Sequence, residues 1–207
     1  MSPRDEAHSL QQAFSLHRSG KFAEAATLYR KIIKRNPKEA HALHSLGIIE
    51  AADGNTAEAA RLMARSLSVQ AANIPFMQNY ATVLCQLGEY QSAAAVCLKG
   101  LQLDGANAYL LYVAAGALFK QGRSQDALVQ FDRLLSLEPN HIAAITERSS
   151  VLLAMEQHDA AAAAIEKAIA LDPQYGEAHL NRGILYSQLK RYDDAIGSFD
   201  RALLLLG

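Results

Sequence analysis

The feature that most constrains this chain is a pattern that recurs every 34 residues from residue 6 to the last residue. Alanine holds one position in all six copies, and a larger apolar or aromatic residue follows four positions later. The alanines are Ala25, Ala59, Ala93, Ala127, Ala161 and Ala195. The larger residues are Tyr29, Met63, Cys97, Phe131, Ile165 and Phe199. A fixed period of this length predicts stacked similar units, because one such unit cannot bury its apolar face alone.

Each copy reads as two helices joined by a short turn. The second helix should end near a slot that holds Pro37, Pro139 and Pro173, because proline disfavours the helical conformation in the residue before it. Small residues on the first helices should face the alanine column and let the paired helices approach closely. They are Gly47, Ala81 and Ala115.

The turns between the paired helices carry glycine in the first four copies, at Gly20, Gly54, Gly88 and Gly122. Glycine accepts the left-handed backbone conformation that ends a helix. Copies five and six carry Glu156-Gln157 and Lys190-Arg191 instead. We therefore expect their turns to be strained or capped differently.

This pattern resembles the tetratricopeptide repeat, a helix–turn–helix unit of 34 residues. The signature residues of the first helices are Leu43, Leu46 and Gly47 in copy two, Tyr80, Ala81 and Leu84 in copy three, and Gly183 and Tyr186 in copy six. The resemblance implies an all-α fold, a right-handed superhelical solenoid of about twelve helices. It also implies that residues 1–207 form a single solenoid, with repeats 6–39, 40–73, 74–107, 108–141, 142–175 and 176–207.

Composition excludes several classes of partner. The 20 basic and 21 acidic residues leave a formal net charge of -1, so we expect no nucleic-acid partner, which would require a clustered basic face. The N-terminus has no apolar core of a signal peptide. The longest apolar run, residues 108–119, is too short to span a bilayer, so we expect no membrane partner. Cys85 and Cys97 lack a CxxC partner, which indicates packing thiols in a reducing compartment and a cytoplasmic location.

No grouping of residues indicates catalysis. GxSxG, HExxH, CxxC and phosphate-binding glycine loops are absent from the sequence. The adjacent Asp193 and Asp194 point about 100° apart on a helix and are favoured there by the helix dipole. His41 and His44 have the spacing of a metal-ligand pair but no third ligand. We therefore expect no enzyme activity, no metal and no cofactor.

The resemblance implies that the first helices line a concave groove, at the second, fifth, sixth, ninth and twelfth positions of each repeat. The candidate groove residues are Leu10, Phe14, His41, His44, Gln78, Asn79, Thr82, Tyr109, Tyr112, Phe119, Thr146 and Asn181. The same positions also hold Gln11, His17, Ser45, Ile48, Cys85, Glu147, Ser150, Glu177 and Ser187. This mostly uncharged, amide-, hydroxyl- and aromatic-rich set suits an extended peptide. Packing between helices is an equally good role for any single aromatic among them.

Two functions fit these observations. The first is a non-enzymatic scaffold that binds peptide or helical segments of a protein partner. The second is a substrate-recruiting N-terminal arm of a longer enzyme, because the repeats look like those of bacterial proteins similar to O-linked N-acetylglucosamine transferases. Those repeats carry inward asparagines at the sixth position. Asn79 and Asn181 match this pattern, whereas Gln11, Ser45, Val113 and Glu147 differ.

The last helix should be uncapped. Residues 203–206 are four consecutive leucines, which cover every side of a helix, and Gly207 falls in the proline slot of copy six. Solenoids of this kind normally end in a polar-faced cap. The sequence therefore predicts either continuation into a longer protein or self-association through this helix.

Overall fold

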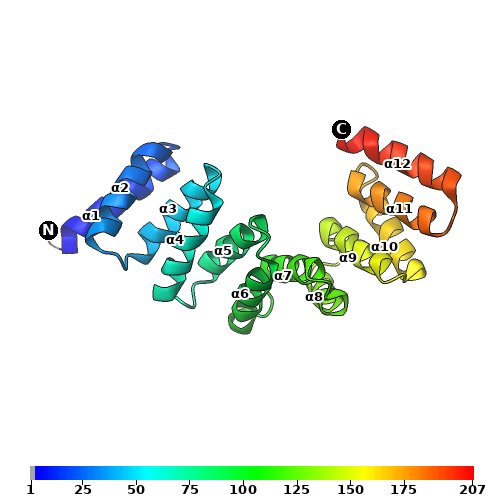
Figure 1. The fold of residues 1–207 in the computed structure, drawn as a ribbon, viewed down its shortest axis with the longest axis horizontal. Coiled ribbons are helices and arrows are strands. Elements are labelled where there is room, and N and C mark those ends of the chain that lie inside the picture. Colours follow the sequence, from blue (N-terminus) through cyan, green and yellow to red (C-terminus); the bar gives the residue numbers. More distant parts are fainter. Residues whose placement is uncertain (1–2) are drawn as a thin grey trace. The chain divides into compact units, whose positions relative to one another are not determined.

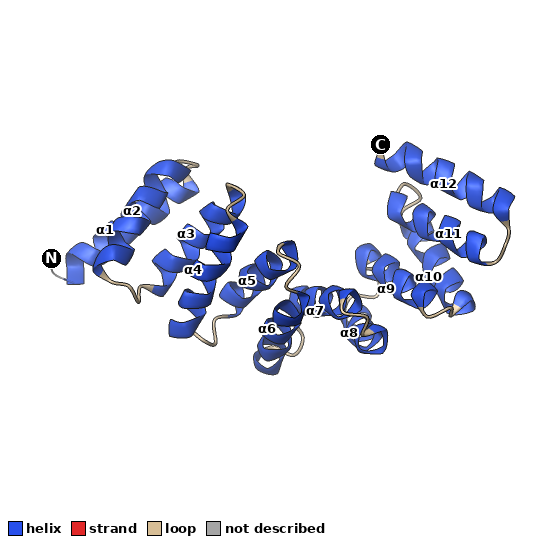
Figure 2. Cartoon of the chain, viewed as in Figure 1, coloured by secondary structure: helices blue, strands red, loops and turns tan. Residues whose placement is uncertain are grey.

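The computed structural model describes the backbone of residues 3–207 and the side chains of residues 7–207. Within this range every regular element is an α-helix, and the connecting segments are short turns (Figure 2). The first helices of the six repeats are α1 (Pro3–Arg18), α3 (Ala40–Ala52), α5 (Ile74–Gln86), α7 (Ala108–Lys120), α9 (Ile142–Ala154) and α11 (Gly176–Gln188). The second helices are α2 (Phe22–Arg35), α4 (Thr56–Val69), α6 (Tyr90–Leu103), α8 (Ser124–Leu137), α10 (His158–Leu171) and α12 (Tyr192–Leu206). The all-α architecture of tandem helical hairpins is confirmed.

The chain forms two compact units, Met1–Gly105 and Ala106–Gly207. Unit 1 contains α1 to α6 and unit 2 contains α7 to α12, so each unit holds three hairpins (Figure 1). Within a unit, each helix packs on the helix that follows it in the sequence. A single continuous solenoid stays a prediction from the unbroken sequence period.

The alanine column lies at the interface between paired helices. Its members are 0% exposed in five repeats, and Ala195 is 3% exposed. A Cβ atom placed on Gly47 would lie 2.9 Å from Met63 Cγ and 3.3 Å from the carbonyl oxygen of Ala59. The first helix of repeat two therefore needs glycine where it crosses the second, as the sequence predicted.

The larger residues four positions after the alanines fill the space between hairpins. They are buried in repeats one to five, with exposures of 0–1%. Phe199 of α12 is 36% exposed. In repeat one this residue is Tyr29, and it packs in one cluster with Leu43, Leu46 and Ile49 of the next hairpin. The core of each unit is thus a chain of such clusters.

The turns of the first four repeats and of the last two share one backbone geometry, so the expected difference in capping is absent and a non-glycine residue takes the left-handed position. The four turn glycines have φ between 75° and 83°. Glu156 and Lys190 adopt the same left-handed conformation, with φ of 57° and 60°. The same backbone hydrogen bond closes the turn with and without glycine. Arg123 N donates to Leu118 O at 3.0 Å in repeat four, and Gln157 N donates to Leu152 O at 2.9 Å in repeat five. Repeats five and six therefore keep the turn geometry without the residue that adopts it most easily.

Within the part of the chain that the structure describes, no helix combines the length and apolar character needed to cross a bilayer.

Candidate functional site

In unit 1 the first helices bring a row of rings together. Phe14 of α1 lies edge-on to His41 of α3, with ring centroids 6.4 Å apart. His41 is edge-on to Phe76 of α5 at 5.3 Å, and Phe76 stacks on His44 at 3.9 Å. We call Phe14, His41, Phe76 and His44 the ring row. Because each contact joins neighbouring repeats, the row fixes the surface of three successive first helices.

His44 is the buried member of the ring row, at 5% exposure. Asn79 Nδ2 lies 3.0 Å from its Nε2, so Nε2 accepts and the imidazole proton resides on Nδ1. That Nδ1 is buried and has no hydrogen-bond partner. Burial, and secondarily the proximity of His41, lower the pKa of His44 to about 4. His44 is therefore a neutral, tightly packed group rather than an exposed contact.

The remaining candidates of unit 1 lie along the same face with more solvent contact. His41 is exposed, with its Nε2 3.2 Å from Gln70 Nε2. Phe14 and His17 of α1 line an open hollow of about 450 Å³ together with Gln11 and Arg18. Leu10 is half-buried and packs on the core cluster of repeats one and two.

Gln78, Asn79 and Thr82 of α5 are half-buried, and the Thr82 hydroxyl donates to the Gln78 carbonyl at 3.1 Å. The face thus offers amides, a hydroxyl and imidazoles beside apolar rings, with no acidic group among the candidates.

In unit 2 the aromatic candidates divide into packed and exposed residues. Tyr112 of α7 stacks on His141 at 5.6 Å and lies edge-on to Phe131 at 6.2 Å. Burial first, and then Glu147, Tyr175 and Glu177, raise the pKa of Tyr112 to about 12. Phe119 is half-buried, whereas Tyr109 is 44% exposed. Tyr112 is therefore part of the packing, and Tyr109 presents the accessible ring.

Two carboxylates distinguish the unit 2 face from that of unit 1. Glu147 of α9 and Glu177 of α11 are exposed. Desolvation around its carboxylate raises the pKa of Glu147, Lys120 opposes the shift, and Glu177 adds to it. Burial and then Glu177 raise the pKa of Tyr175. The two glutamates and two tyrosines thus share one electrostatic neighbourhood.

Asn181 binds the preceding repeat rather than facing open solvent. It is 6% exposed, and its Nδ2 lies 3.0 Å from Thr146 O, 2.9 Å from Ser149 Oγ and 2.8 Å from Ser150 Oγ. Thr146 is 4% exposed, and its own hydroxyl is buried without a hydrogen-bond partner. Asn79 makes the corresponding contact in unit 1. Both sixth-position asparagines therefore join their helix to the fifth position of the repeat before.

Two ring residues of these faces were missed from the sequence. Phe76 and His141 occupy the third position of repeat three and the N-cap of α9, outside the positions implied by the family resemblance. His141 also caps its helix, because its Nδ1 accepts from Ala144 N at 3.1 Å. The available signal was the register, since Phe76 lies one 34-residue period after Ala42, which stands between His41 and His44.

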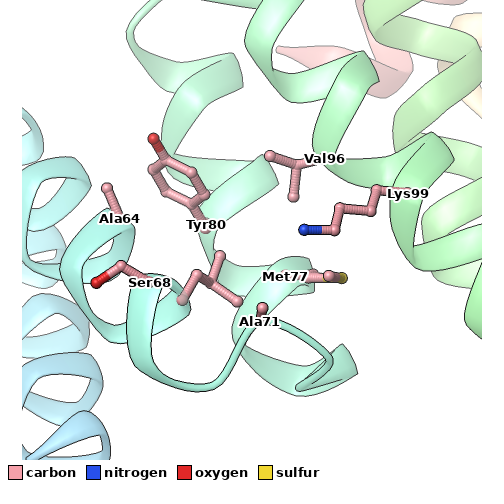
Figure 3. A pocket seen from close by; sticks show the side chains of 8 residues that line it. Ala64, Ser68, Ala71, Met77, Tyr80, Val96 and Lys99 are labelled. Carbon is pink, nitrogen blue, oxygen red and sulfur yellow. The ribbon is translucent and has the colours of Figure 1, made fainter.

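A second hollow of about 260 Å³ lies between α4, α5 and α6 (Figure 3). Its lining is mostly apolar, with Met77 and Val96 at the wall and the Lys99 amine reaching toward the middle. Ala64 stands where repeat one has Arg30, whose guanidinium pairs with Glu50 at 2.5 Å. The hollow is smaller than the usual range of ligand pockets.

Among the residues described, no three histidine, cysteine, aspartate or glutamate side chains are grouped so that they could hold a metal ion. Cys85 and Cys97 are free, and burial raises the pKa of the Cys97 thiol to about 12. This thiol is therefore protonated at neutral pH and a poor nucleophile.

Comparisons with known proteins agree on the architecture. MamA is 23% identical with a TM-score of 0.71, over 80% of this chain and 91% of its own. YrrB is 20% identical with a TM-score of 0.78, over 82% and 88%. A tetratricopeptide repeat protein from Parabacteroides merdae is 17% identical with a TM-score of 0.85, over 97% and 80%. These likenesses show the fold.

Sequence comparison reaches a shorter stretch. Cellulose synthase 2 operon protein C of Komagataeibacter xylinus is 42% identical over 57 residues, which are 28% of this chain and 4% of that protein. The model of the family described as tetratricopeptide repeat matches residues 10–74 and 146–204, together more than half of the chain. With this match and six helical hairpins of 34 residues, the chain belongs to the tetratricopeptide repeat family.

Proposed function

We propose that this chain is a non-enzymatic scaffold that binds extended peptide segments of a protein partner on the faces of its first helices. The observation that carries the proposal is the ring row of unit 1. Its buried members hold the exposed edge of His41 in a fixed position beside the amides of α5. A face ordered before binding loses less conformational entropy when a peptide docks.

The chemistry of the two faces suits a peptide backbone with apolar side chains. The Thr82 hydroxyl donates to the Gln78 carbonyl and the Asn79 nitrogen faces His44, so on α5 the side-chain oxygens of Thr82 and Asn79 are the groups that can accept from peptide N–H groups. The hollow beside Phe14 can take an apolar side chain. Unit 2 adds the accessible ring of Tyr109. YrrB, which has this fold, is described as a TPR protein with an unusual peptide-binding site, which supports a peptide as the ligand.

The test is binding of a library of extended fluorescent peptides to the 207-residue chain, followed by anisotropy. His41→Ala should weaken the peptides selected by unit 1, and Tyr109→Ala should weaken those selected by unit 2. His8→Ala is the matched control, because His8 is an exposed histidine of α1 at a position outside the predicted groove. Equal affinity of wild type and both groove variants would remove the first helices from the binding site.

The second candidate, a substrate-recruiting arm of a larger enzyme, rests on Asn79 and Asn181. An asparagine that reads a peptide backbone uses both its amide nitrogen and its carbonyl oxygen. The nitrogen of Asn181 already faces three acceptors within the chain. A peptide would therefore have to displace those contacts, which favours the first candidate.

A further inference from the structure

A series of hydrogen bonds in unit 1 ends on the imidazole ring of His41. It begins at the N-cap of α5, where Phe76 N donates to Asn73 Oδ1 at 3.1 Å. Asn73 Nδ2 donates to Gln70 Oε1 at 2.8 Å, and Gln70 Nε2 lies 3.2 Å from His41 Nε2. Asn73 and Gln70 are half-buried, whereas His41 is exposed. The series therefore connects the backbone of α5 to an exposed side chain of α3.

The backbone end of this series determines which atoms donate and which accept. A backbone N–H can only donate, so the atom of Asn73 that meets Phe76 N is the side-chain oxygen. The Asn73 nitrogen then donates to the oxygen of Gln70, and the nitrogen of Gln70 donates to His41. Because His41 Nε2 accepts this bond, the proton of the neutral imidazole resides on Nδ1.

Aromatic contacts hold the same ring on its other sides. Phe14 and Phe76 lie edge-on to His41, with ring centroids 6.4 and 5.3 Å away. A flip that exchanged the positions of the ring nitrogens would lose the bond from Gln70. In the part of the chain that the structure describes, no residue accepts the Nδ1 proton of His41. His41 thus presents a donor of fixed orientation on an exposed side chain.

Closing the turn before α5 does not require the contact between Gln70 and His41. The position of Gln70 holds Asn36 in repeat one and Asp172 in repeat five. Each of these accepts from the backbone N–H two residues further on, at 3.1 and 2.8 Å, within its own turn. Gln70 has a side chain one methylene longer, and it reaches the first helix of its repeat instead. The contact therefore serves the orientation of His41.

We infer that His41 Nδ1 donates to a backbone carbonyl oxygen of the peptide bound on unit 1, and that Gln70 is the residue that positions this donor. The inference rests on the proposed function, in which extended peptides bind the first helices. Thr82 and Asn79 offer acceptors for peptide N–H groups. An extended backbone also presents one carbonyl oxygen per residue. His41 supplies the complementary donor beside those acceptors.

The surroundings of His41 favour a neutral acceptor over an anion. Glu39 Oε1 accepts from His41 N at 3.2 Å, which places a carboxylate beside the same residue. That carboxylate would repel an acidic side chain or a phosphate group of a ligand. A backbone carbonyl oxygen carries no net charge and can accept from the neutral imidazole without this repulsion.

Nuclear magnetic resonance tests the donor without any ligand. Long-range proton–nitrogen correlation spectra of the 207-residue chain, labelled with ¹⁵N-histidine, distinguish the two imidazole tautomers, and His41→Ala identifies the His41 signals. At pH 8 the proton of His41 should be on Nδ1. Gln70→Glu should move it to Nε2, because a carboxylate only accepts. Gln91→Glu adds the same charge at an exposed position of α6 and should leave the proton on Nδ1.

Peptide binding tests the acceptor. In the anisotropy assay, Gln70→Glu should weaken the peptides that depend on His41 by about tenfold, since an acceptor would then face the peptide carbonyl, and Gln91→Glu should not. A thioamide at one peptide bond replaces the carbonyl oxygen by sulfur, a poorer acceptor, and keeps the N–H. At one position of the peptide this change should reduce affinity for wild type but not for His41→Ala.

An Nε2–H tautomer in the unbound wild-type chain overturns the inference before any peptide is added. If His41→Ala weakens binding and Gln70→Glu does not, the inference fails and the scaffold proposal stands without it. If no peptide binds to either unit, the proposed function fails and the carbonyl contact fails with it. The wild-type tautomer and the thioamide comparison do not need Gln70→Glu, so both tests stay in force if circular dichroism shows that this variant is unfolded.

Discussion

At the scale of single residues, the buried imidazole of His44 makes the stability of unit 1 depend on pH. Its folded pKa is about 4, lowered by burial and then by His41, against an ordinary value of 6.5. Below pH 6.5 the unfolded chain binds a proton that the folded chain excludes. Stability should therefore fall as pH drops from 6.5 to about 4, by on the order of 2–3 kcal/mol.

Urea unfolding at pH 7 and at pH 4.5 measures this effect. His44→Gln should show a smaller loss of unfolding free energy between the two pH values than wild type. His8→Gln is the control, because His8 is exposed, and it should leave the loss unchanged. If His44→Gln kept the full pH dependence, His44 would not be the group responsible.

Glu147 should have the opposite pH profile. Its pKa is raised in the folded state, so its contribution to stability is present below the unfolded pKa and is lost as pH rises through the folded value. Glu147→Gln should therefore stabilise the chain at pH 7, by a few tenths of a kcal/mol once exposure to solvent is considered. A thermal melt that shows no gain at pH 7, or the same gain at pH 4, would contradict this expectation.

The sequence predicted a set of groove positions, but it could not predict which of their side chains the fold itself would bury. His44, Thr146 and Asn181 are groove candidates that the structure places at 4–6% exposure. Their burial depends on contacts with residues about one repeat away, such as Asn79 for His44, and these contacts depend on how neighbouring helices pack. Phe76 was missed for the same reason, since a ring at that position becomes part of the face only through its stacking on His44.

At the scale of helices and turns, the left-handed residues of repeats five and six are strained. Non-glycine residues lose about 1–2 kcal/mol in this conformation. Glu156→Gly and Lys190→Gly should each stabilise unit 2 by about 1 kcal/mol, less the added flexibility of glycine in the unfolded chain. Gly122→Ala, at φ of 75°, should destabilise by a similar amount in the same melts. A lower midpoint for Glu156→Gly would show that its side chain contributes more than its backbone strain costs.

The alanine column should reject larger side chains. Ala161 and Ala163 lie two residues apart on α10, and only Ala161 is fully buried. Ala161→Leu should destabilise by about 1–3 kcal/mol through overpacking, whereas Ala163→Leu should be nearly neutral. If the two variants had the same melting temperature, the paired helices would not approach closely at Ala161.

The elements were predictable because their signals are local. Pro37, Pro139 and Pro173 lie two residues beyond the ends of α2, α8 and α10. The alanines mark the close-packed side of each second helix in the sequence itself. The 34-residue period runs unbroken through the division into two units, and the local signal there is Gly105, which replaces the proline of the repeat junction as Ala71 also does in repeat two.

At the scale of the whole molecule, the protection of backbone amides from hydrogen exchange should decrease toward the two terminal helices. In unit 1, α3 and α4 have packed neighbours on both sides, whereas α1 packs on α2. Amide hydrogen exchange should therefore be faster in α1 than in α3, and faster in α12 than in α9 or α10. Uniform exchange over all helices would contradict it.

The contacts between hairpins join residues that are close in sequence. Within each unit the helices that touch are consecutive, or are alternate first helices such as α3 and α5. Contacts between neighbouring hairpins need only short loops to close, so the loss of chain entropy before they form is small. Residues of unit 1 can pack without waiting for any residue of unit 2, since each unit contains its own core. Such a chain can fold hairpin by hairpin as it leaves the ribosome, beginning with α1 and α2.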